Sequence, residues 1–135
     1  MQQNMQTTQL HMEITTLEQL ADVIVLLQEN LQQWNVTEEK QVDLKLCVME
    51  AVQNALLHGG TEYTVPKAQI FWQCDAKGFR FTVADNGTGI SQDKRNTEYQ
   101  ETLKESGRGL LLMRAILDEV NYNEQGNAIT GILRW

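Results

Sequence analysis

The stretch Val42–Leu57, VDLKLCVMEAVQNALL, decides the fold. It is rich in Val, Leu, Met and Ala and holds no proline or glycine, which predicts a buried helix. Glu50, Asn54 and His58 follow one another at four-residue steps, so they line one face of that helix. Unpaired polar groups are costly to bury. A polar stripe on such a helix therefore indicates a functional site.

Two glycine clusters follow this helix along the chain. They are Asp85-Asn86-Gly87-Thr88-Gly89, after an apolar strand pattern, and Gly107-Arg108-Gly109, before a helical pattern. Glycine lets the backbone approach a ligand closely, and the free N–H groups at the start of a helix attract anions. An acidic stripe followed by two glycine-lined turns indicates a nucleotide held together with a divalent metal ion.

The residue types suit that chemistry. Beside a phosphate-bound metal ion, Glu50 could act as a general base toward a hydroxyl group or water. Asn54 could offer its carbonyl oxygen to magnesium, which takes only one or two protein ligands in such sites. Asp85 could accept a hydrogen bond from the exocyclic amine of adenine. Gly87 and Gly89 would let the backbone pass beside the base.

Each of these features also has a plainer interpretation. Glu50 could lie at the helix surface while Asn54 caps a neighbour, and His58 could pair with a backbone carbonyl. The Asn86-Gly87 pair is common in ordinary turns, and Arg108 could be a solvated side chain. Neither cluster is a Walker A loop or a Rossmann fingerprint, because the spacing is wrong and no Gly-Lys-Ser/Thr triplet occurs. The combination favours the functional interpretation.

Composition limits the classes of protein. The 135 residues fit one domain, with residues 1–8 as a flexible terminus and 9–135 as the folded unit. The net charge of −7 argues against nucleic acid as a partner. Apolar runs are too short for a membrane span and no leader segment opens the chain, so we expect a cytoplasmic protein.

Cys47 and Cys74 lie in apolar patterns without metal-ligand spacing, which predicts buried free thiols. With only His11 and His58, a metalloenzyme is not expected.

Periodicity and capping signals predict the order strand, helix, helix, strand, strand, helix, strand, strand. Thr16 and Thr37 are the predicted N-caps of the first two helices. The predicted elements are strand 9–15, helix 16–34, helix 37–58, strands 68–74 and 79–84, helix 110–120, and strands 120–123 and 128–135. This order predicts an α+β fold, a two-layer α/β sandwich with a mixed sheet packed on helices.

Three motifs stand together in this chain. They are Glu50-Ala-Val-Gln-Asn54-Ala, Asp85-Asn-Gly-Thr-Gly89-Ile and Gly107-Arg-Gly-Leu-Leu-Leu-Met-Arg-Ala-Ile. Together they strongly resemble the GHKL ATPase superfamily, which has the Bergerat (histidine-kinase-like ATPase) fold, and the match covers nearly the whole chain. Within it the chain looks most like the anti-sigma factor serine kinases of stress response and sporulation. A bare domain, His58 after the first motif, and the Ser106-Gly-Arg-Gly-Leu run favour that branch.

The resemblance implies roles for individual residues. Glu50 would be the base for an acceptor serine hydroxyl, Asn54 would hold magnesium, and Asp85 would bind adenine. The segment 90–106 would be the lid over ATP, and Thr130 would match a late-strand threonine that supports the base. The other nucleotide-binding positions that the resemblance implies are His58, Gly87, Gly89, Ile90, Gly107, Arg108, Gly109 and Leu110.

The resemblance also implies a function. It is that of an ATP-dependent, magnesium-requiring protein serine kinase that acts as an anti-sigma, partner-switching regulator of transcription. The substrate would be a STAS-domain anti-anti-sigma protein, and a homodimer would capture a sigma factor or another regulatory protein. No nucleic-acid or membrane partner is expected. Two alternatives stay open: a non-catalytic ATP-gated module that binds a partner, and the detached catalytic domain of a histidine kinase.

Overall fold

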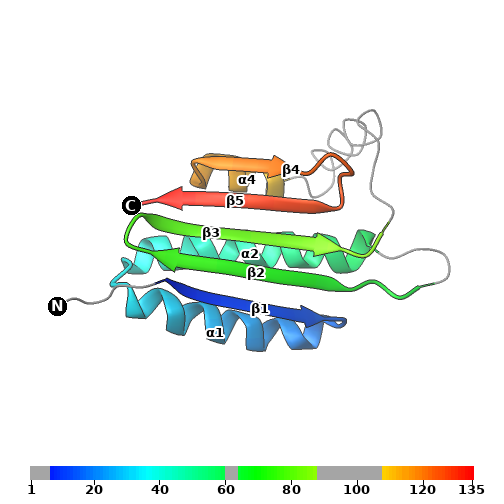
Figure 1. Ribbon diagram of the computed structural model, residues 1–135, viewed down its shortest axis with the longest axis horizontal. Coiled ribbons are helices and arrows are strands. Elements are labelled where there is room, and N and C mark those ends of the chain that lie inside the picture. The colour runs from blue at the N-terminus through cyan, green and yellow to red at the C-terminus, as the bar shows by residue number, and fades with distance from the viewer. Residues whose placement is uncertain (1–6, 60–63, 88–107) are drawn as a thin grey trace.

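The computed structural model describes residues 7–59, 64–87 and 108–135. In this part of the chain, one sheet is covered on one face by helices, while its other face carries none (Figure 1). The elements are β1 (Thr8–Ile14), the 3-10 turn η1 (Leu17–Gln19), α1 (Leu20–Gln33), α2 (Glu38–His58), β2 (Ala68–Asp75), β3 (Gly78–Asp85), α4 (Arg108–Ile116), β4 (Glu119–Tyr122) and β5 (Ala128–Arg134). The predicted element order and the α+β sandwich are confirmed.

The sheet has five strands in the order β1-β2-β3-β5-β4, and every neighbouring pair is antiparallel. The prediction of a mixed sheet is therefore wrong. Two helices, not one, connect β1 to β2, so the chain returns antiparallel. Beyond α4 the neighbour of β3 is β5 and not β4, which makes that pair antiparallel as well.

Local capping fixes where the first two helices begin. The Thr16 side chain accepts from the backbone N–H of Gln19, and the Gln19 side chain accepts from the N–H of Thr16, forming a capping box. Thr37 accepts from the N–H of Lys40 at the start of α2. Both predicted N-caps are confirmed, with Thr16 capping the 3-10 turn η1 that leads directly into α1. Gly59 is the C-cap of α2, so the helix ends at His58, as predicted.

The core lies between the helices and the inner face of the sheet. Its largest members are Trp72, Phe79 and Phe81, all fully buried. The Trp72 indole is also tied to α1, because its Nε1 donates to Asn30 Oδ1 over 2.8 Å. The stripe of α2 that faces this core consists of Leu44, Cys47, Val48, Ala51, Val52 and Ala55. This stripe fixes the rotation of α2 about its own axis.

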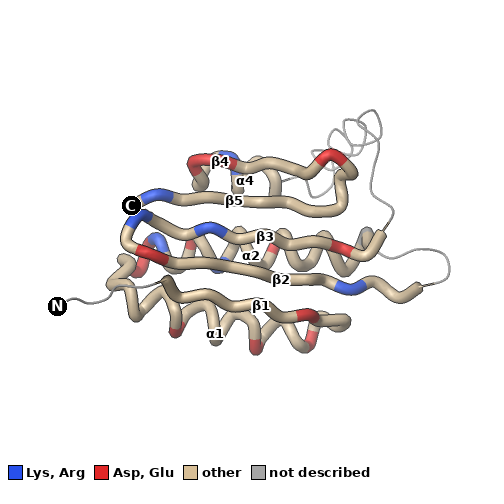
Figure 2. The backbone as a smooth tube through the Cα atoms, viewed as in Figure 1, with Lys and Arg blue, Asp and Glu red and all other residues tan. Residues whose placement is uncertain are grey.

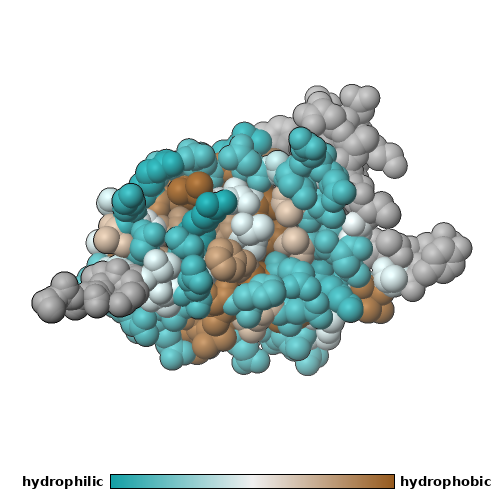
Figure 3. Space-filling model, viewed as in Figure 1, coloured by the Kyte–Doolittle hydropathy of each residue, from teal (hydrophilic) through white to brown (hydrophobic). Residues whose placement is uncertain are grey.

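The other face of the sheet is lined by polar side chains. Gln9 pairs with Gln73 across β1 and β2, and the Thr82 and Thr130 hydroxyls lie 2.9 Å apart across β3 and β5. Figure 3 shows hydrophilic residues over much of this face, with hydrophobic residues between them. Acidic and basic positions are interspersed along the elements (Figure 2). Within the described residues, no helix combines the length and apolar character needed to cross a bilayer.

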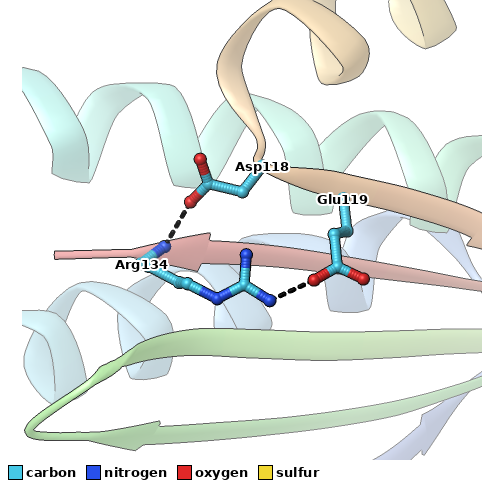
Figure 4. Close-up of polar contacts among 3 residues, drawn as sticks. All are labelled: Asp118, Glu119 and Arg134. Atoms are coloured by element: carbon cyan, nitrogen blue, oxygen red, sulfur yellow. Dashed lines mark hydrogen bonds and ion pairs between the residues drawn. The ribbon is translucent and has the colours of Figure 1, made fainter.

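The third predicted helix is shorter than expected. It ends at Ile116 instead of residue 120, because the backbone N–H of Asp118 donates to Ile132 O and draws the chain into the sheet. The Asp118 carboxylate then accepts from the N–H of Arg134 over 2.7 Å, and Glu119 forms an ion pair with the Arg134 guanidinium (Figure 4). These contacts with β5 override the helical pattern of the sequence. The predicted flexible terminus, 1–8, falls outside the described residues except for Thr7 and Thr8, and Thr8 already belongs to β1.

The two cysteines are buried free thiols, as predicted. Burial is the main cause that raises the pKa of each thiol to about 12, and the nearby carboxylate, Asp43 for Cys47 and Asp75 for Cys74, contributes to this rise.

We therefore expect both thiols to resist a disulfide-exchange reagent at pH 8 in the folded protein, because the thiolate is the reacting form. In urea the same thiols should react freely, since their pKa returns toward 9. Absorbance of the released thiolate measures both rates. Native labelling as fast as in urea would contradict this account.

Candidate functional site

The C-terminal end of α2 lies against the end of β3. A Cβ atom on Gly59 would lie 2.7 Å from Asp85 Cβ and would also clash with the carbonyl oxygen of Ala55. Real Cβ atoms do not approach so closely, so only glycine permits this contact. It places Asp85 beside the helix that carries Glu50 and Asn54. No pattern in the sequence indicates this close packing of Gly59 against Asp85.

The turn after β3 is held by its own side chains. The N–H of Gly87 donates to Asp85 Oδ1 over 2.7 Å. Asn86 accepts from the N–H of Lys67 and donates to Val65 O, each over 2.8 Å. The Asn-Gly pair thus forms a turn, as its plainer interpretation held, and that turn also orients the Asp85 carboxylate.

The turn between β4 and β5 reaches the same place. The backbone N–H of Asp85 donates to Asn127 O over 2.8 Å, and Asn127 Nδ2 donates to Gly87 O over 3.4 Å. Asn127 was not among the predicted site residues. Its position directly after Gly126, in a hairpin turn of the last strand pair, was the available signal.

The structure does not bring Thr130 to this cluster. Its hydroxyl pairs with Thr82 on the face of the sheet without helices. Its neighbours along β5, Ile129 and Gly131, are the buried positions that face the helices. The position of Thr130 therefore does not support its predicted role beside the adenine base.

Glu50 lies about two helical turns before the end of α2, against the first turn of α4. A Cβ atom on Gly109 would lie 2.7 Å from Glu50 Cδ, so the absence of a side chain there leaves room for the carboxylate. The two helices enclose a cleft of about 260 Å³. The cleft is lined by Leu46, Met49, Glu50, Gln53, Gly109 and Leu112. Glu50 is thus a half-buried carboxylate in the wall of a mostly apolar cleft.

The other predicted positions vary in what the structure shows. Asn54 is half-buried one helical turn beyond Glu50, and Leu110 packs partly buried against the core. His58 and Arg108 are the last residue of α2 and the first of α4, but their side chains are not described. Gly89, Ile90, Gly107 and the predicted lid lie outside the described residues.

Comparison with known proteins assigns the family. Residues 15–133 match the histidine kinase-like ATPase domain, and the chain belongs to that family. The match confirms the resemblance to the GHKL superfamily, and the named relatives fall in its anti-sigma factor and serine-protein kinase branch. An ATPase domain implies ATP as the nucleotide.

Three relatives illustrate that branch. The chain is 33% identical over 92 residues to the anti-sigma F factor of Halalkalibacterium halodurans, which is 65% of this chain and 63% of the relative. It is 27% identical over 129 residues to the anti-sigma F factor of Bacillus subtilis, covering 90% and 88%. It is 31% identical over 91 residues to the serine-protein kinase RsbW of Oceanobacillus iheyensis, covering 62% and 58%. The chain thus spans less than two thirds of the first and third relatives.

We expect Gly59→Ala to lower the free energy of unfolding by about 1–3 kcal/mol, the usual cost of overpacking. The backbone of Gly59, with φ −82°, suits alanine, so the loss would come from the contacts with Asp85 and Ala55 alone. Urea unfolding measures the change. Gly109→Ala is the matched control: its methyl group meets only a movable carboxylate, and alanine favours a helix by up to about 1 kcal/mol. Equal losses in both variants would contradict the special role of Gly59.

Proposed function

We propose that this chain is a cytoplasmic, ATP-dependent protein serine kinase that works as an anti-sigma, partner-switching regulator. The names of its relatives, anti-sigma F factor and serine-protein kinase, support the class of function. The observation that carries the proposal is the Glu50 carboxylate in the wall of the cleft beside the start of α4. A module that only binds nucleotide does not need a base at that place.

The described residues fit a nucleotide laid along α2. Asp85, held by Gly87 and Gly59, would accept the hydrogen bond of the adenine amine at one end. The first turn of α4, where Gly109 has no side chain to block approach, would receive the phosphates at the other end. Asn54 offers an amide oxygen between these two ends, a hard ligand that suits Mg²⁺. ATP would supply the phosphoryl group, and Mg²⁺ would neutralise its charge.

Glu50 would act on the acceptor. Its carboxylate takes the proton from a serine hydroxyl as the new bond forms between the serine oxygen and the γ-phosphorus. The bond from that phosphorus to the β–γ bridging oxygen breaks, ADP leaves, and Glu50 returns its proton to water. Because such transfers need little covalent help from the protein, positioning is the main contribution of the chain.

The proposed acceptor is a serine on a STAS-domain anti-anti-sigma protein, and the proposed captive is a sigma factor held by a homodimer. The relatives named anti-sigma F factor support this class of partner. Switching follows from linkage: a nucleotide that changes the affinity for one partner must have its own affinity changed by that partner to the same extent.

We expect Glu50→Gln to bind ATP as the parent does but to lose transfer by about 10²–10⁴-fold, the usual contribution of a general base. The measurement is label transfer from γ-labelled ATP to candidate STAS proteins, with ATP affinity determined in parallel. Glu39→Gln is the charge control, since it removes an exposed carboxylate from the first turn of the same helix.

Each outcome has a distinct meaning. Acid-stable label on serine that is lost only in Glu50→Gln supports the kinase. Undiminished transfer by Glu50→Gln would contradict the assignment of Glu50 as the general base. Acid-labile label would indicate a catalytic domain that serves a separate histidine. Tight ATP binding without transfer to any partner would favour the ATP-gated binding module.

A further inference from the structure

One asparagine closes the turn between β4 and β5. Asn123 Oδ1 accepts from the backbone N–H groups of Gly126, Asn127 and Ala128, over 2.8, 3.0 and 3.2 Å. Gly126 has φ 78°, a left-handed conformation that favours glycine, and its N–H also donates to Asn123 O. This part of the network needs only an acceptor at Asn123 and serves the hairpin itself.

The amide nitrogen of Asn123 connects the hairpin to the side chain of Asn127. Asn123 Nδ2 donates to Asn127 Oδ1 over 2.7 Å. With that oxygen engaged, the Nδ2 group of Asn127 points the other way and donates to Gly87 O over 3.4 Å. The hairpin does not require this second pair of bonds, because its turn is already closed by the bonds to Asn123 Oδ1.

The side-chain hydrogen bonds from Asn123 through Asn127 to Gly87 end at the proposed adenine-binding site. Gly87 donates its N–H to Asp85 Oδ1, and Asp85 donates its own N–H to Asn127 O. Asn127 therefore holds the turn after β3 at two points, one by its backbone and one by its side chain. The orientation of the Asp85 carboxylate depends on Gly87, and the position of Gly87 is braced by Asn127.

We propose that Asn123 and Asn127 are positioning residues for the adenine ring of the nucleotide. They orient the Asn127 amide toward Gly87 and thereby fix the Asp85 carboxylate. This carboxylate then sets the preference for a purine with an exocyclic amine. The inference rests on the proposed function in one respect, that Asp85 is the residue that receives the adenine. It assigns a role in recognition to two side chains that lie outside the motifs of the sequence.

Two variants separate this role from support of the hairpin. Asn127→Ala removes the side-chain bridge and keeps the backbone bond to Asp85. Asn123→Asp keeps the acceptor for the three N–H groups and removes only the donor to Asn127. With a carboxylate as neighbour, Asn127 turns its Nδ2 toward residue 123, and its oxygen then faces Gly87 O without a hydrogen bond. Asn121→Ala, at an exposed position of β4 outside the network, is the control.

The experiment compares the affinities for ADP and for inosine diphosphate, which carries a carbonyl where adenosine carries the amine. Calorimetry gives both dissociation constants, and thermal unfolding gives the midpoint of each variant. We expect the parent and Asn121→Ala to prefer ADP by about tenfold or more, the range of one good base contact. Asn127→Ala and Asn123→Asp should reduce that preference by about threefold or more, while Asn123→Asp keeps the parent's unfolding midpoint, because its turn stays closed.

The outcomes distinguish this inference from the proposed function. A preference for ADP in the parent that persists in both variants overturns the positioning role. Equal affinity of the parent for the two nucleotides overturns the assignment of Asp85 and this inference with it. The positioning role is also overturned if Asn123→Asp loses its preference for ADP only to the extent that its unfolding midpoint falls. Support of the hairpin would then explain the effect. Failure to transfer phosphate changes none of these binding ratios.

Discussion

The packing of α2 against the sheet is the constraint on which the proposed site depends. The buried stripe that includes Leu44, Val48 and Val52 fixes the rotation of the helix. Because that stripe is apolar, the polar residues of α2 are confined to its flanks, where Glu50 faces α4 and the helix end faces Asp85. Any change that rotated α2 by one residue, about 100°, would move both ends of the site together.

Local signals account for what the sequence predicted correctly. The caps at Thr16 and Thr37 and the hairpin of β2 and β3 each depend on residues close together in the chain. The sheet order and the end of α4 depend on β5, which lies far along the sequence, so no local pattern could fix them. Period-two alternation divides β5 into two faces but does not say which one meets the helices. Thr130 was assigned to the site through the family resemblance, and this alternation could not reveal that it lies on the opposite face.

The proposed site residues also divide into those that local sequence indicates and those that depend on distant segments. Glu50, Asn54 and Asp85 could be predicted as candidate site residues because their residue types and spacing suit the chemistry. The proposed positioning residue Asn127 could not be selected in this way, because its contacts with Asp85 and Gly87 join turns that are separate in the chain. Residues that act through such contacts carry no sequence pattern of their own. They become visible only when the turns are placed side by side.

The two ends of the proposed site are built differently. At Asp85 the carboxylate is fixed by backbone hydrogen bonds, by a glycine contact that tolerates no side chain, and by the Asn127 bridge. At Glu50 the neighbour of the carboxylate is the bare backbone of Gly109, and the cleft beside it is open and mostly apolar. A rigid end suits a nucleotide that must be recognised before any partner arrives. An adjustable end suits a carboxylate that must meet a hydroxyl group delivered by another protein. If the proposed function holds, this difference in how the two carboxylates are held would allow nucleotide binding and transfer to be altered separately.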